Sequence, residues 1–359
     1  MKKRIGIVAL ILSLPFGEGW GGASAFAQDI HFSQSGMTPL LLNPALTGVF
    51  DGHQRVFLNY KNQWQGMAEA GAAYNTALFS FDTRVLKKKW NRGYIGAGIN
   101  AFKDVAGDLK VGTTQLNISI AGVVIINKQQ LISGGIQGGY AQKSISTANM
   151  QWENQYDPGT NAYNGSLLSN DMIDIPPYSY GDFSAGLAWS YNAYKPSAYG
   201  DRQKRFNLGI GAFHLNRPNQ KLNPYSSNIA DNLYAKYIVH GSGQVSMGAS
   251  RYQLVPSFAF FLQGPSSVVN VGTMVRWTIK GQSRYTGYVQ GMALSLGALY
   301  RTKDAVIPMM LFEYSDFAAG LSYDVNTSSL MMGTKGRGGV EISLRYVRPI
   351  GISPTRLLD

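Results

Sequence analysis

The chain has no cysteine among its 359 residues. This absence excludes a disulfide framework, a zinc finger and an iron–sulfur site, and it excludes a lipoprotein, whose lipid is attached to an N-terminal cysteine. Charged residues are also scarce, at 14% against about 25% in an average soluble protein. The low charge rules out a disordered charged tail, a coiled coil and a charged helical repeat. Beyond residue 27 no run of about 18 apolar residues exists, so no transmembrane helix is expected.

Signatures of catalysis are missing as well. The four histidines, at positions 31, 53, 214 and 240, form no His-Glu-x-x-His pair. No Gly-x-Ser-x-Gly motif nominates a nucleophile, and the glycine-rich stretch 134–139 lacks the Gly-Lys-Ser/Thr of a phosphate loop. We therefore expect no enzyme, no metal, no cofactor and no small-molecule substrate. A hydrolase that assembles Ser, His and Asp from distant strands stays open as an alternative.

The formal net charge is +12. Such an excess suits nucleic acid, anionic lipid headgroups or an acidic protein partner. The one cluster of basic residues past the N-terminus is the run 87–89, and there is no basic helix or arginine run. We therefore expect no nucleic-acid partner.

The N-terminus has the pattern of a secretory signal peptide. Lys2, Lys3 and Arg4 precede an apolar run at 5–14, and a stretch of small residues ends in Ala25-Phe26-Ala27. The apolar run is about half the roughly 20 residues that a spanning helix needs. We predict cleavage after Ala27 and export from the cytoplasm.

Alternation with a period of two recurs along the rest of the chain. In 95–101 the apolar residues Ile95 and Ile99 alternate with glycine and asparagine, and 206–213 and 340–347 follow the same pattern. An apolar face opposite a small or polar one is typical of a strand with lipid outside and polar groups inside. We count about 14 such segments, starting near residues 54, 75, 92, 113, 130, 180, 204, 235, 252, 266, 286, 304, 315 and 338.

The pattern predicts an all-β fold, a transmembrane outer-membrane β-barrel of about 14 antiparallel strands. The expected organisation is a signal peptide at 1–27, an N-terminal periplasmic or plug segment at 28–53, the barrel at 54–348 and a periplasmic tail at 349–359. A secreted soluble β-sandwich or β-helix is the alternative interpretation of the same alternation.

Two segments are candidates for contact with a partner. In 28–48 the prolines Pro39 and Pro44 exclude a regular helix or an interior strand, and the apolar run 40–42 must pack in the lumen, under the barrel mouth or on a partner. The connection 144–179 is about three times longer than an ordinary loop. Its candidate partner-binding residues are Trp152, Glu153, Tyr156, Asp157, Tyr163 and Tyr178. The alternative is that this loop folds over its own barrel as a plug.

Both ends of the mature chain carry motifs of a known family. The N-terminal motif residues are Phe32, Ser33, Gln34, Pro39, Leu40, Leu42, Asn43, Pro44, Ala45, Gly48, Asn62, Gln63 and Trp64. With the C-terminal stretches 320–326, 328–330 and 338–344, they resemble the PorP/SprF family, outer-membrane proteins of the type IX secretion system of Bacteroidota. Ser35, Thr38 and the pair Leu46-Thr47 depart from the family pattern.

The resemblance implies a non-enzymatic component of this secretion machinery. Its implied partners are a periplasmic ring lipoprotein, a peptidoglycan-binding protein, outer-membrane lipid, and the C-terminal domain of a large secreted adhesin of the gliding type. The motif residues are then expected to contact the lumen as a plug or to contact a partner. A diffusion channel or porin is the alternative function, with Lys110, Lys143, Arg276 and Arg345 as candidates to line an anion-selective pore.

Overall fold

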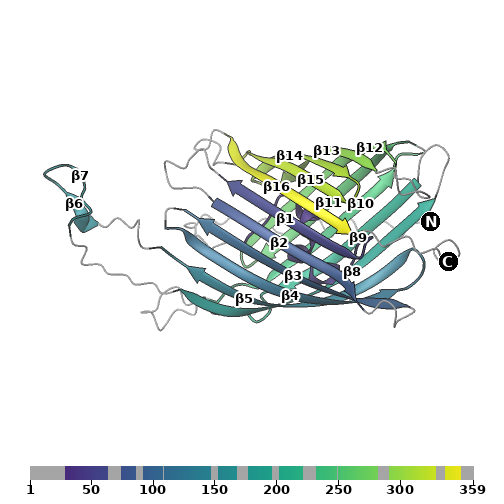
Figure 1. Ribbon diagram of the computed structural model, residues 1–359. Helices are drawn as coiled ribbons and strands as arrows, with labels where there is room; N and C mark the ends of the chain where they lie inside the picture. Colours follow the sequence, from purple (N-terminus) through teal and green to yellow (C-terminus); the bar gives the residue numbers. More distant parts are fainter. Residues whose placement is uncertain are drawn as a thin grey trace, which may run out of the picture.

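The computed structural model describes residues 29–63, 74–85, 92–107, 109–146, 153–167, 177–195, 202–220, 232–248, 250–281, 291–328 and 336–348. Fourteen antiparallel strands form one closed barrel in the order β1-β16-β15-β14-β13-β12-β11-β10-β9-β8-β5-β4-β3-β2, seen from the side in Figure 1. The signal peptide and the C-terminal tail expected from the sequence lie outside the described residues.

The barrel strands are 10 to 18 residues long, which suits tilted strands that cross a bilayer. Their bounds are β1 (Gln54–Gln63), β2 (Tyr74–Val85), β3 (Gly93–Ala106), β4 (Val111–Ile125), β5 (Gln130–Ser144), β8 (Tyr178–Lys195), β9 (Arg202–Phe213), β10 (Lys236–Ser246), β11 (Tyr252–Gln263), β12 (Ser266–Lys280), β13 (Met292–Arg301), β14 (Ala305–Tyr314), β15 (Phe317–Asn326) and β16 (Arg337–Arg348).

The first and last strands close the sheet, because β1 pairs with β16 over its whole length, from Gln54 opposite Arg348 to Gln63 opposite Gly339. Closure leaves no open edge, which is what a sheet in lipid requires. The sequence prediction of an outer-membrane barrel of about 14 strands is confirmed, and the soluble sandwich or β-helix is wrong. Thirteen strands begin within three residues of the predicted position, and β13 begins six residues later.

Along the strands, apolar side chains point outward and polar side chains point inward, which is the reverse of a soluble protein and typical of a membrane barrel. Ile118 and Ile136 face outward with 60% and 66% of their surface exposed, while the inward-facing Asn117 and Ser119 are buried. The alternation sets polar groups against the lumen and apolar groups against lipid. Aromatic side chains stack on the outer surface, as Tyr252 and Trp277 do with ring centroids 6.5 Å apart, and such rings favour the headgroup level.

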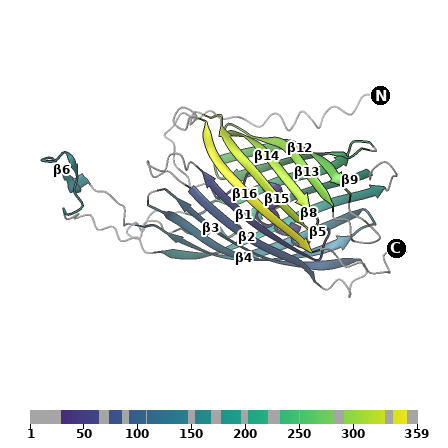
Figure 2. The ribbon, with the colours of Figure 1, turned by 45° about the horizontal axis from the view of Figure 1, so that its top comes forward.

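The two ends of the barrel differ. At the short-turn end, where β1 begins and β16 ends, the connections 126–129, 247–251 and 315–316 are tight. The long-loop end carries the connection 145–177 between β5 and β8. Part of this connection forms a separate hairpin of β6 (Tyr156–Asp157) and β7 (Ala162–Tyr163), which stands beyond the barrel on the left of Figure 1 and in the turned view of Figure 2.

Between the barrel wall and its axis, residues 29–53 form three short helices, η1 (Ser35–Met37), α1 (Pro39–Leu42) and η2 (Pro44–Leu46). Proline stands at the first position of α1 and of η2, where its missing N–H costs nothing. Within the described residues, no helix has the length and hydropathy to cross a membrane.

Candidate functional site

The barrel lumen is occupied by residues 29–53, here called the lumen segment. At the long-loop end the backbone N–H of Asp29 donates to Gln263 Oε1 over 3.3 Å. At the short-turn end the N–H of His53 donates to the carbonyl of Arg348 over 2.8 Å. The segment therefore runs the length of the barrel, entering at the long-loop end and leaving at the short-turn end, where β1 begins.

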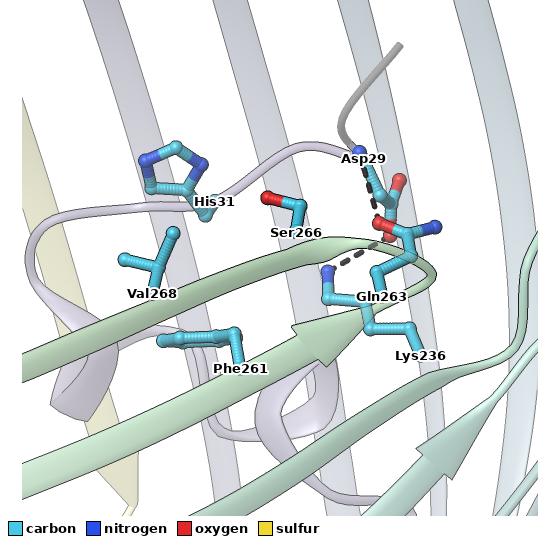
Figure 3. A pocket seen from close by; sticks show the side chains of 7 residues that line it. All are labelled: Asp29, His31, Lys236, Phe261, Gln263, Ser266 and Val268. Atoms are coloured by element: carbon cyan, nitrogen blue, oxygen red, sulfur yellow. Dashed lines mark hydrogen bonds and ion pairs between the residues drawn. The ribbon is translucent and has the colours of Figure 1, made fainter. Parts of the chain in front are cut away.

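Four charged or ionisable groups hold the segment at the long-loop mouth. Lys236 Nζ lies 2.9 Å from Asp29 Oδ2, and His214 Nε2 lies 3.3 Å from the same oxygen. His214 Nδ1 lies 3.0 Å from Asp182 on β8. Figure 3 shows the Asp29 side of this group, with both dashed contacts, to Gln263 and Lys236, converging on Asp29.

The charges of this cluster are set by its own members. Burial opposes ionisation of Asp29, but Lys236 and His214 outweigh it and hold the pKa of Asp29 below its usual range. Burial also opposes protonation of His214, yet the hydrogen bonds of Asp182 and Asp29 raise the pKa of His214 to about 9. At neutral pH Asp29 is thus ionised and His214 is protonated, so the two attract each other.

The space beside the cluster is small. The pocket in Figure 3, lined by Asp29, His31, Lys236, Phe261, Gln263, Ser266 and Val268, has a volume of about 30 Å³. A second pocket, deeper in the lumen between Ile30 and Phe102, has about 20 Å³. Each has room for about one or two water molecules, and neither has room for an organic ligand.

A second anchor binds the segment to β15 and β16. Glu341 is fully buried, and its carboxylate accepts the backbone N–H of Ser33 over 2.7 Å and that of Gln34 over 3.0 Å. Ser33 Oγ donates to Asp324 over 2.7 Å, and Arg301 forms an ion pair with the same carboxylate. Hydrogen bonds to charged groups are worth about 1.5–3 kcal/mol, so this is a strong attachment.

Asn43 holds the middle of the segment. Its Oδ1 accepts from the N–H of Ala45 over 2.9 Å and so caps η2. Its Nδ2 donates to the carbonyl of Leu187 over 2.9 Å and lies 3.1 Å from His240 Nε2. Leu42, one residue earlier, packs with the buried Phe213 and three other wall residues, Ile238, Ala259 and Phe261. One short motif therefore supplies a polar and an apolar contact to the wall.

Glycines on the inner face of the wall make room for these contacts. A Cβ added to Gly135 would come 2.5 Å from Pro44, and one on Gly211 would come 2.6 Å from the carbonyl of Leu42. At Gly186 an added Cβ would overlap Asn43. Distances below 3.0 Å are not compatible with a side chain, so the wall is shaped to the segment.

The last turn of the segment is fixed by Gly48, whose φ of +74° is a conformation that favours glycine. Its N–H donates to Asp82 over 2.7 Å, and its carbonyl accepts from Arg84 Nε over 2.9 Å. Asp82 is in turn paired with Arg55 over 2.8 Å. These contacts tie the end of the segment to β1 and β2.

The lumen contains ten of the thirteen N-terminal motif residues, from Phe32 to Gly48. Asn62 and Gln63 lie on β1 at the long-loop end, where Asn62 Nδ2 donates to Asn75 over 2.5 Å, and Trp64 lies outside the described residues. Of the loop candidates, Tyr156, Asp157 and Tyr163 form the β6–β7 hairpin, while Glu153 begins the helix η4 (Glu153–Gln155) and Tyr178 begins β8. Trp152 lies outside the described residues.

Sequence reasoning missed the wall residues that receive the segment. The main ones are Asp82, Asp182, Lys236, Arg301, Asp324 and Glu341. Each is a charged residue on the inner face of an alternating strand, as Glu341 is between Val340 and Ile342. A charged residue at an inward-facing position of an alternating strand could therefore have been recognised in the sequence, because a charge buried in a barrel wall needs a partner in the lumen.

Within the described ranges no group of three His, Cys, Asp or Glu side chains is placed to hold a metal ion. Both ring nitrogens of His214 face carboxylates, and His240 faces the amide of Asn43. The contacts around these two histidines are those of structural hydrogen bonds.

The fold and the filled lumen define an outer-membrane β-barrel. The model of the family described as type IX secretion system membrane protein PorP/SprF matches residues 24–346, so the chain belongs to this family. The resemblance seen in the sequence motifs is confirmed, and the chain is an outer-membrane component of the type IX secretion system. No curated protein matches the chain.

Solved structures that are similar in fold are outer-membrane barrels of low identity. The CymD monoaromatic hydrocarbon channel is 11% identical with a TM-score of 0.40, covering 88% of this chain and 93% of its own. The toluene transporter TodX of P. putida is 9% identical with a TM-score of 0.40, covering 86% and 92%. CdiB from Acinetobacter baumannii is 7% identical with a TM-score of 0.37; 83% of this chain is covered, and the chain spans 60% of CdiB.

Proposed function

We propose that the chain is a sealed, non-enzymatic barrel that serves type IX secretion as a docking platform. Its long-loop end takes part in the secretion and surface anchoring of a large adhesin of the gliding type, and its other end links to the periplasmic ring. The observation that carries the proposal is the lumen segment, which fills the barrel from end to end and is bound to the wall by Glu341, Asn43 and Asp82.

A filled lumen does not suit a diffusion channel. The pockets beside the segment have room for one or two water molecules each but not for a larger solute. Two of the four cations considered for an anion-selective pore are engaged in polar contacts at the wall, since Arg276 and Arg345 both pair with Glu313. Lys143 donates to Gln220 over 2.8 Å, and Lys110 lies in the turn before β4.

The orientation follows from the ends of the sheet. In outer-membrane barrels the short turns face the periplasm and the longer loops face the outside. The short-turn end is where β1 begins and β16 ends, which supports its assignment to the periplasm. The β6–β7 hairpin is then on the cell surface, with Tyr156 and Tyr163 exposed by 49% and 46%, and aromatic residues are common anchors of protein interfaces.

Export is proposed to proceed through cleavage after Ala27. Mass spectrometry of the N-terminal peptide of the protein purified from outer membranes is expected to find Gln28, as glutamine or pyroglutamate, at the first position. An N-terminus at Met1 would contradict this step.

Planar-bilayer recording tests the sealed barrel. The purified protein is expected to give no conductance steps, whereas a variant lacking residues 32–48 is expected to conduct, because the wall then encloses only water. A gel shift between unboiled and boiled samples shows that each variant is folded. Steady conductance of the unaltered protein would overturn the proposal in favour of a porin.

The docking role is tested in cells that lack the chain and are complemented with it. Large surface proteins that disappear from the surface in the deletion strain are expected to return with the complementing chain. Surface proteomics of the two strains provides the measurement. An identical surface proteome in both strains would contradict the role in secretion and anchoring.

A further inference from the structure

Among the described residues, the excess positive charge is concentrated at one end of the barrel. Each described charged residue can be assigned to the nearer end by its place on the strands. Arginine and lysine outnumber aspartate and glutamate by thirteen to four at the short-turn end, and by nine to eight at the long-loop end. Among these residues, almost all of the net positive charge therefore lies at the short-turn end.

Inside the short-turn mouth the positive charges are arginines that face the lumen. Arg276 and Arg345 share the single carboxylate of Glu313, and Arg345 Nη2 lies 2.9 Å from it. The Nε of Arg345 is a buried donor with no hydrogen-bond partner among the described residues. Two guanidinium groups on one carboxylate leave donors for a further acid.

Two more arginines line the same mouth. Arg205 pairs with Asp51, and the side chains of the two are 34% and 64% exposed. Arg84 donates to the carbonyl of Gly48 and lies over the rings of Phe50 and Tyr94. The described contacts of the Arg84 side chain are thus with a carbonyl oxygen, the ring of Phe50 and the ring and hydroxyl of Tyr94.

We propose that the short-turn end is a docking surface for an acidic segment of a periplasmic protein, which places its carboxylates at the arginines of the mouth. The assignment of the partner to the periplasm rests on the proposed function. The negative charge of the partner is inferred from the charges of this surface alone. Arginine is the side chain that binds carboxylates with two parallel hydrogen bonds. Anionic phospholipid is less suited, because inward-facing arginines point away from the bilayer.

The rim around this mouth adds exposed charges that attract the same partner. Lys128 lies in the turn between β4 and β5, and Lys280 ends β12, both on the exposed surface. Lys110 and Lys303 are two exposed lysines on turns at the long-loop end, and they serve as the matched control pair. Opposite charges steer association and set its salt dependence.

The test uses the full chain in nanodiscs and a fluorescein-labelled peptide of ten glutamates. Peptide binding is followed by fluorescence anisotropy. The double variant Lys128→Glu and Lys280→Glu is expected to weaken binding about tenfold, and Lys110→Glu with Lys303→Glu less than about twofold. Both double variants lower the net charge of +12 by four, so the comparison isolates position. Equal losses in both would overturn the proposal.

Two further arms separate the mouth from the rim and protein from lipid. Arg205→Gln with Arg276→Gln keeps hydrogen-bonding side chains but removes two charges from the mouth, and it is expected to weaken binding as much as the rim variant. Binding is expected to persist in nanodiscs of phosphatidylglycerol. Loss of binding in phosphatidylglycerol would assign the surface to lipid headgroups instead. Full binding by the arginine variant would overturn the assignment of the acidic segment to the arginines of the mouth.

If the first rim variant does not fold, Arg92→Glu with Arg251→Glu replaces it, because the described contacts of these two turn residues are made by their backbone. Failure of this peptide test leaves the conductance test of the sealed barrel untouched. The two outcomes are therefore distinguishable.

Discussion

Asn43 occupies the space that a side chain on Gly186 would need. An added Cβ at Gly186 would overlap the Asn43 carboxamide, whose nitrogen donates to the carbonyl of the next residue, Leu187. A residue near the start of the chain and a glycine in β8 thus depend on each other. The lumen wall and the lumen segment are in this respect one packed structure.

Neighbouring glycines on β5 allow a direct test of this packing. A Cβ added to Gly135 would come 2.5 Å from Pro44, whereas one added to Gly134 would meet only Leu187, at 3.4 Å. Gly135→Ala is expected to destabilise the folded barrel by about 1–3 kcal/mol through overpacking, and Gly134→Ala to leave stability near that of the unaltered protein. Denaturant titration followed by the gel shift measures both. Equal stability of the two variants would show that the lumen segment shifts to accommodate the added methyl group without a measurable cost in stability.

Removing the charge of Glu341 is expected to loosen the second anchor. In Glu341→Gln one side-chain oxygen becomes an NH₂ group, so either Ser33 or Gln34 loses its acceptor. An unsatisfied buried donor costs about 1–3 kcal/mol. Because the chain has no native cysteine, Ser33→Cys can be labelled alone, and its maleimide reaction is expected to be faster when Glu341→Gln is also present. Asp316→Asn, at the other end of the barrel, serves as control and is expected to change nothing.

The mouth cluster is expected to weaken in alkaline solution. The pKa of His214 is raised from 6.5 to about 9 in the folded protein, so its contribution is complete below pH 6.5 and is lost as the pH rises through 9. At about 1.4 kcal/mol per pKa unit the loss is at most about 3.5 kcal/mol. Maleimide labelling of Ile30→Cys, corrected for the thiolate fraction, is expected to rise near pH 9. The His214→Gln background is expected to show no such step, and a step retained there would assign the titration elsewhere.

The β6–β7 hairpin is expected to carry adhesin contact through its aromatic rings. Tyr156→Ser with Tyr163→Ser removes two half-exposed rings, and surface retention of the cognate adhesin is expected to fall while the barrel remains non-conducting. The double Tyr→Phe variant keeps the rings and is expected to retain the adhesin. Surface proteomics and bilayer recording measure the two properties. A conducting barrel with normal retention would make the hairpin a plug.

The sequence by itself determined the barrel. Alternation in stretches such as 340–347 assigns Val340 and Ile342 to lipid and Glu341 to the lumen, because the side-chain period of a strand is two, and the structure has this assignment. The motif residues from Phe32 to Gly48 were also recognisable, since two prolines and an apolar run exclude an ordinary strand or helix.

Only the tertiary structure decided where those residues lie and what they bind. Local pattern cannot show that Glu341 receives Ser33 from 308 positions away, or that Gly135 and Gly211 lie against Pro44 and Leu42. It also could not show the direction of the segment, which begins at the long-loop mouth beside Lys236. These relations depend on which strands face each other across the closed lumen, and closure is a property of all fourteen strands together.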